Sequence, residues 1–294
     1  MIDPKRIEQI PMIREHASRL ICLANDIVSS RHGPYQGKDF LGAMADAFMH
    51  KQIDNLKSIC ILVDNGQNPD ALIIARSAYE NMALLLWAAH GPDTSLRETR
   101  PLKWFAYEYI EGYRQIIQNK NRDADIASGA KTAIYRGVQE YADIFLTNKA
   151  EEDLRQGKTL SIDPFIKGWP SENLSDRVDE LKKKGYIDQN AYQLYQILSQ
   201  WLHGTPQGMG MVFRHDGNCF LQDEYTCKYL GGCAIHIGIQ SLANTAVLFN
   251  NHLRLDFTDR LNELKNKYNE LSIVTSQRYC KPGKSNTPRQ HETV

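Results

Sequence analysis

The sequence has no net charge and no membrane-length apolar run that is free of polar residues. Lysine plus arginine and aspartate plus glutamate number 35 each among 294 residues. The whole chain therefore creates no field that attracts nucleic acid or an anionic membrane, although a local basic patch is compatible with this sum. Hydrophobic residues at 42% and charged residues at 24% are ordinary for a globular protein with a sizeable core.

The six cysteines form no Cys-x-x-Cys pair, and no secretory signal segment is recognised at the N-terminus. This pattern favours reduced thiols and predicts a cytoplasmic protein. Cys233 and His236 share a helix face, but Cys227 lies six residues before Cys233 and off that face. We therefore favour buried thiols over a zinc site, and the sequence predicts neither a metal nor a cofactor.

The two longest apolar stretches both carry polar side chains at their centres. Residues 72–89 contain Arg76 and Glu80, and residues 233–249 contain His236. Such groups are costly in lipid. The sequence therefore predicts buried core helices and no membrane-spanning segment.

Apolar residues recur at helical spacing through most of the chain, and no internal repeat is visible. We predict one all-α bundle of about seven to eight helices over residues 1–272, followed by a polar tail over 273–294 without fixed structure. The exception is a small β-hairpin near residues 211–221, with its turn at 215–218. Helices are expected, among others, at 39–64, 70–90, 101–118, 188–204 and 224–252, and a more polar surface helix at 131–155.

A short connection joins the helices expected at 39–64 and 70–90. Gly66 is a natural helix stop and Asp70 a natural N-cap. Short connections favour antiparallel neighbours, so these two helices are expected to pack as a hairpin.

Arg76 and Glu80 lie one turn apart in the otherwise apolar second helix of this hairpin, and so share a face. Three interpretations stay open: an exposed ion pair, a buried pair that fixes helix register, and a site where Arg76 holds an anion and Glu80 acts as a base. The apolar neighbours of the pair leave little room for a wet face.

Ser199 and His203 repeat this spacing, with Tyr195 one turn earlier. A histidine at a helix C-terminus is favoured by the helix dipole, which is the simplest explanation of His203. A serine near a histidine is also typical of an activated nucleophile, but no strand-to-helix elbow or oxyanion hole is recognisable, so a serine hydrolase is disfavoured. The two matching pairs suggest one polar centre built from two helices.

Arg214 and His215 follow at the predicted hairpin, where a loop could cover that centre. We regard them as weak binding candidates, since ordinary turn residues are the more common explanation. No phosphate-binding glycine loop is present.

In order and context, these motifs resemble an uncharacterised bacterial family, the domain of unknown function 5677. Its pattern is an apolar helix with Arg-x-x-x-Glu and a later helix ending in Ser-x-x-x-His-Gly, here Arg76, Glu80, Ser199 and His203 within residues 39–255. The resemblance implies a helical bundle and supplies no established activity. A looser likeness is to HEPN-type helical modules of defence systems, whose nucleases carry arginine four to six residues before histidine. No histidine here has that spacing, so a related site requires Arg76 from another helix.

Two functions follow as expectations. The first is a defence or toxin-antitoxin-related module that acts on RNA or a nucleotide, with Arg76 holding phosphate, His203 acting as acid or base, and Glu80 and Ser199 orienting them. The second is a non-catalytic bundle that binds a ligand or protein partner and whose polar centre is structural. The sequence leaves a homodimer open.

Overall fold

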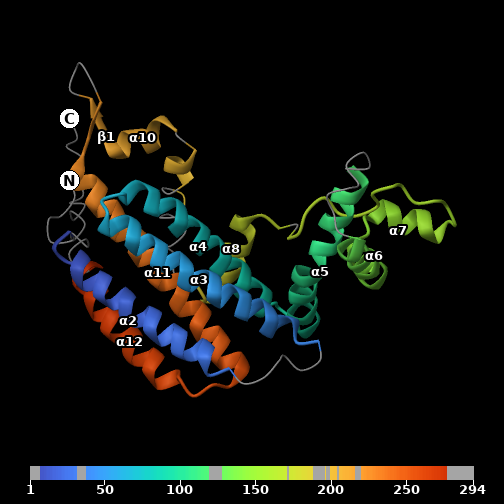
Figure 1. Ribbon diagram of the computed structural model, residues 1–294, viewed down its shortest axis with the longest axis horizontal. Helices are drawn as coiled ribbons and strands as arrows, with labels where there is room; N and C mark the ends of the chain where they lie inside the picture. The colour runs from blue at the N-terminus through green and yellow to red at the C-terminus, as the bar shows by residue number, and fades with distance from the viewer. Residues whose placement is uncertain are drawn as a thin grey trace, which may run out of the picture.

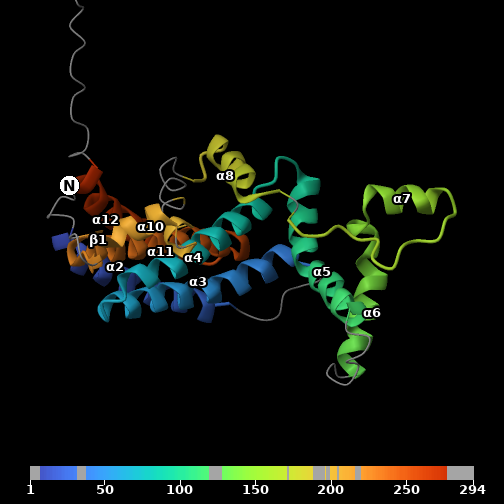
Figure 2. The same ribbon diagram turned by 90° about the horizontal axis from the view of Figure 1, so that it is seen from above.

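The computed structural model describes most of the chain, and everything below concerns this part: residues 7–31, 38–118, 128–170, 172–187, 196, 199–203, 205–215 and 220–276. The protein is all-α, as predicted, with one short strand pair. A long bundle contains α2, α3, α4, α11 and α12, and α5, α6 and α7 lie at one end of it (Figures 1 and 2).

The centre of the bundle consists of α3 (Phe40–Asp64), α4 (Asn68–Ala89) and α11 (Glu224–Leu253), which pack closely against one another. The Asp39 side chain caps α3 by accepting the Gly42 N–H at 2.8 Å. Gly66 adopts the left-handed conformation, with φ of 75°, that lets the chain turn into α4. The prediction of Asp70 as N-cap is wrong, because α4 begins at Asn68 and Asp70 lies in its first turn.

Two further helices, α2 (Ile10–Ser29) and α12 (Thr258–Ser276), complete the bundle and lie side by side (Figure 1). Arg260 on α12 donates to Asp26 on α2 at 2.8 Å. The face of α2 toward the bundle is apolar and fully buried at Ala17, Ala24 and Ile27. The apolar stripe thus decides which side of α2 faces the core.

A second apolar cluster lies where α5 (Thr94–Gln118) meets η1 (Ala142–Phe145) and the following connection. It contains Ala106, Tyr107, Ile110, Phe145 and Phe165. The single helix predicted for 131–155 is wrong: α6 (Ser128–Tyr141), η1 and α7 (Asn148–Arg155) replace it, because Leu146 turns extended and bridges Phe165. The predicted start of a helix at Pro101 is also wrong, since Pro101 lies inside α5.

Two short helices and the strand pair follow. α8 (Leu174–Lys183) packs on α4, and α10 (Pro206–Val212) leads into β1 (Phe213–His215), which pairs antiparallel with β2 (Phe220–Gln222). Residues 211 and 212 end α10 and are not part of a strand. The described part of the chain has more helices than the seven to eight predicted, because it also contains the shorter helices α6 to α8 and α10.

In the described part of the chain, α11 is the one helix with the length and apolar composition to cross a membrane. Of the most apolar part of α11, 61% is buried inside the bundle, as in the core helix of a large helical protein. The expected single domain over 1–272 stays a prediction.

Candidate functional site

The Arg76 and Glu80 side chains form an ion pair on α4, with Arg76 Nε donating to Glu80 Oε1 at 3.1 Å. The Arg76 side chain is 17% exposed and that of Glu80 41%. Ile73, one turn earlier, is also partly exposed, whereas Ala75 and Ala78 are fully buried. The expectation of little room for a wet face is therefore wrong for Glu80, because the helical period puts its side of α4 at the edge of the bundle.

His203 reaches the same point from a segment 127 residues away, and its Nε2 lies 3.3 Å from Arg76 Nη1. His203 is exposed. Guanidinium groups only donate, so this contact is a hydrogen bond when Nε2 carries no proton and the imidazole is neutral. Protonation of His203 would instead place two cations in contact.

Of the other residues predicted from sequence, Ser199 lies one turn before His203, and its carbonyl accepts the His203 N–H at 3.1 Å. Arg214 and His215 lie in β1, but their side chains are outside the description. Tyr195 is outside the described residues altogether. The structure thus brings Arg76, Glu80 and His203 together, with Ser199 on the same turn as His203.

The turn before α10 fixes where His203 lies. The Thr205 hydroxyl accepts the Gly208 N–H at 3.0 Å and donates to the Gln200 carbonyl at 3.2 Å. A β-carbon on Gly208 would lie 2.2 Å from that carbonyl oxygen, so only glycine fits. Trp201 packs against the main core. The Trp201 side chain and the Thr205 hydrogen bonds therefore fix the turn that carries His203.

A second arginine centre, around Arg100, was not anticipated from the sequence. Arg100 donates to both carboxylate oxygens of Glu180 at 3.1 and 3.0 Å and to the Trp87 carbonyl at 2.7 Å. Its guanidinium carbon lies 3.8 Å from the centre of the Trp87 ring, and the indole N–H donates to Glu180 at 3.0 Å. The cluster joins α4, α5 and α8.

Burial opposes ionisation of Glu180, but hydrogen bonds from Arg100 and Lys184 outweigh it and hold the pKa of the carboxyl below its ordinary value. Trp87, Arg100 and Glu180 lie at distant positions in the sequence, so no local spacing of residues predicts the cluster. We interpret it as a structural tie between helices.

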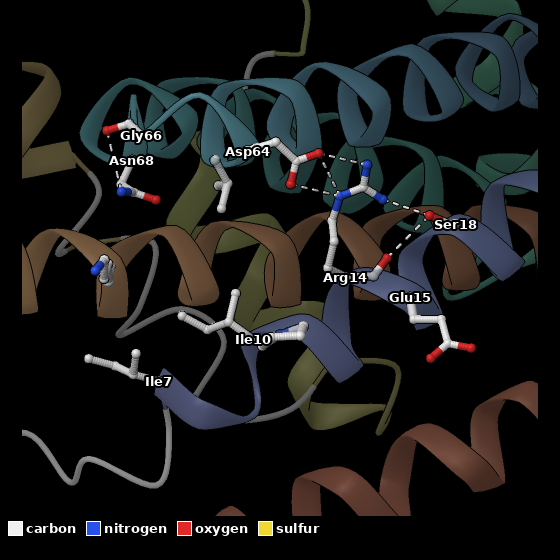
Figure 3. Close-up of a pocket in the computed structure, with 11 residues that line it drawn as sticks. Ile7, Ile10, Arg14, Glu15, Ser18, Asp64, Gly66 and Asn68 are labelled. Carbon is white, nitrogen blue, oxygen red and sulfur yellow. Dashed lines mark hydrogen bonds and ion pairs between the residues drawn. The ribbon is translucent and has the colours of Figure 1, made fainter.

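An open cavity of about 870 Å³ lies near the start of α2 and the turn between α3 and α4 (Figure 3). Arg14 spans it to Asp64, with Nη2 to Oδ2 at 2.9 Å, and donates to Ser18 at 2.6 Å. The cavity shares no lining residue with the Arg76 centre. Its arginine is already paired with a carboxylate, so it offers no evident chemistry.

The described residues contain no group of three or more histidine, cysteine, aspartate or glutamate side chains that could hold a metal ion. Cys227 is buried, and burial raises the pKa of its thiol. Among the described residues, the candidate site combines a guanidinium, a carboxylate and an imidazole.

Fold and site together define the class: an all-α protein with a polar arginine–glutamate–histidine centre at the edge of a helical bundle. The pattern of a family of unknown function (DUF5677) matches residues 45–220, more than half of the chain. The chain belongs to this family, which confirms the predicted resemblance, over a narrower range than the expected 39–255. No curated protein and no solved structure matches.

The matched region contains Arg76, Glu80, Ser199 and His203, and ends at β2. It leaves out α2, α11 and α12 entirely, although α11 packs closely against α4. The likeness to HEPN-type modules stays a prediction.

Proposed function

We propose that the Arg76–Glu80–His203 centre binds a phosphate group of RNA or of a nucleotide, and that His203 transfers a proton there. The observation that carries the proposal is the 3.3 Å approach of His203 Nε2 to Arg76 Nη1, made by two separate segments at an exposed edge. Two exposed side chains and a partly exposed guanidinium are accessible to a large substrate from solvent.

Each side chain has a role that follows from its chemistry. Arg76 presents the planar fork of donors that suits phosphate oxygens. Glu80 accepts the hydrogen bond from Arg76 Nε and so fixes the orientation of the guanidinium. When Arg76 turns from His203 Nε2 to a phosphate oxygen, this nitrogen is open to accept a proton from a ribose 2′-hydroxyl, and the phosphate offsets the added positive charge. That oxygen would then bond to phosphorus, the bond to the 5′-oxygen would break, and the leaving oxygen would take a proton from water.

The wider role that we propose is a bacterial, cytoplasmic module of a defence or toxin-antitoxin system. It rests on the polar centre and on the looser likeness stated above. Expression of the wild-type protein should then slow growth, and the His203→Gln variant should not. Neighbouring genes of defence type would support the role, and a growth effect that is equal for both proteins would contradict it.

A second candidate is a non-catalytic bundle that binds a ligand or protein partner and uses the centre only for contact. It is favoured by the position of Arg76 at the bundle edge, where it lines neither the cavity of Figure 3 nor the cavity described below. Only the first function cleaves RNA, and the cleavage leaves a cyclic phosphate at one new end and a free 5′-hydroxyl at the other.

Labelled single-stranded RNA separates the two, with binding followed by fluorescence anisotropy and cleavage by gel. We expect Arg76→Ala to weaken binding at least about tenfold, because a charge-assisted bond of about 1.5 to 3 kcal/mol is lost. His203→Gln should retain binding and abolish cleavage. Arg19→Ala is the matched control, since Arg19 also forms a one-turn pair, with Glu15, on the exposed face of α2. Binding without cleavage by the wild type would leave the second candidate, and no binding would contradict the first.

A further inference from the structure

A partly open cavity of about 360 Å³ lies between α2, α4, α11 and α12. Its walls combine polar and apolar side chains, and the apolar ones include Leu20 from α2, Met82 from α4 and Ile239 from α11. Tyr186 and Ile187 close one side. The volume is at the small end of the 300 to 1,000 Å³ typical of ligand sites. It shares no lining residue with the Arg76 centre.

A buried histidine without a hydrogen-bond partner faces this cavity. His16 is 6% exposed and makes no hydrogen bond to the described part of the chain. Its ring lies beside that of Tyr268, with centres 4.9 Å apart. Burial, together with the charges of Arg19 and Lys267, lowers the pKa of His16, so the ring is neutral near neutral pH. It offers one donor and one acceptor that a molecule in the cavity can use.

Two carboxamides on successive turns of α11 add further polar groups. Asn244 donates to the Gln240 carbonyl at 3.0 Å and approaches the Met82 sulfur at 3.5 Å. The Gln240 side chain, which also lines the cavity, has no hydrogen-bond partner among the described residues. Apart from His16, Lys265 is the one described residue of the lining whose side chain can carry a positive charge, and Lys265 is exposed. The interior is thus polar without being charged.

We propose that this cavity binds an uncharged planar heterocycle of nucleobase or nucleoside size. Aromatic and aliphatic side chains enclose its faces, and the His16 imidazole and the Gln240 carboxamide hydrogen-bond donors and acceptors on its edge. A phosphate or carboxylate has no buried cation to pair with there, so the site selects against charged forms of the same molecule. This site is independent of the phosphate centre proposed for Arg76.

The test is calorimetric titration of the full chain with each of the four common ribonucleosides, and with adenosine monophosphate as the charged probe. We expect at least one nucleoside to bind at micromolar concentration, and adenosine monophosphate to bind at least tenfold more weakly than adenosine. Gln240→Leu keeps the side-chain shape without its hydrogen bonds and should weaken nucleoside binding about tenfold.

Ala243→Phe should fill the cavity and abolish binding, and Ala133→Phe on exposed α6 is the matched control. If thermal melting shows that Ala243→Phe does not fold, Gln240→Leu decides. No binding of any of the four nucleosides to the wild type, unchanged binding in Gln240→Leu, or equal binding in a folded Ala243→Phe variant would overturn the proposal.

Discussion

The two arginine centres of this protein differ in how closely the fold encloses them. The Arg100 side chain is 8% exposed, pairs with both oxygens of Glu180 and lies over the Trp87 ring. Arg76 lies at an edge, and its partners Glu80 and His203 face solvent. An arginine sealed among its partners ties helices together, whereas one whose partners face water can exchange them for a ligand. The comparison separates a structural centre from a candidate functional one.

The largest expected effect is that of Arg100→Ala. Its loss leaves the Glu180 carboxylate partly buried without its main partner, and removes the stacking on Trp87. We expect the free energy of unfolding to fall by about 3 to 5 kcal/mol, measured by urea denaturation. Arg97→Ala, one turn earlier on α5 and exposed, is the control. A loss below about 1 kcal/mol would show that the sealed centre is not structural.

The next effect is the pH dependence that Glu180 gives to stability. Its pKa is lower in the folded state than the ordinary 4.5, so its contribution is fully present above 4.5 and is lost as pH falls through the folded value. The stability difference between wild type and Glu180→Gln should be about 2 kcal/mol near neutral pH and shrink on acidification. Asp179→Asn, next to it and mostly exposed, should show no such change. A difference that does not vary with pH contradicts the proposed pairing.

A smaller effect is expected for Trp87→Phe, which keeps an aromatic ring and removes the N–H that donates to Glu180 at 3.0 Å. The free energy of unfolding should fall by about 1 to 2 kcal/mol. Trp104→Phe is matched to it, because Trp104 packs on Phe48 and its indole has no hydrogen-bond partner among the described residues. Equal losses in both variants would assign the effect to ring size and not to the hydrogen bond.

The two centres also differ in how far sequence could predict them. Arg76 and Glu80 share a helix turn, as do Ser199 and His203, so spacing alone suggested two faces that meet, and the structure places Arg76 beside His203. Arg100 lies 80 residues from Glu180, and nothing local to either position links them. Pairings set by tertiary packing leave no periodic signal in the chain.

The same limit explains the errors in the fold. The apolar period predicted α3, α4 and α11 well, because long helices carry many repeats of one pattern. Pro101 was interpreted as a helix start, since proline favours first turns, yet α5 begins a full two turns earlier. The break at Leu146 depends on its pairing with Phe165, a partner that local propensity cannot show.

The smallest expected effect on stability is that of Arg76→Ala. This variant tests whether the Arg76 centre differs from the structural Arg100 centre. A one-turn ion pair at the edge of a helix contributes about 0.3 to 0.5 kcal/mol, so urea denaturation should barely distinguish this variant from the wild type while RNA binding falls. Arg19→Ala should match it in stability and leave binding intact. If Arg76→Ala instead lost several kcal/mol, as expected for Arg100→Ala, the Arg76 centre would be a second structural tie, and its approach to His203 would serve packing and not chemistry.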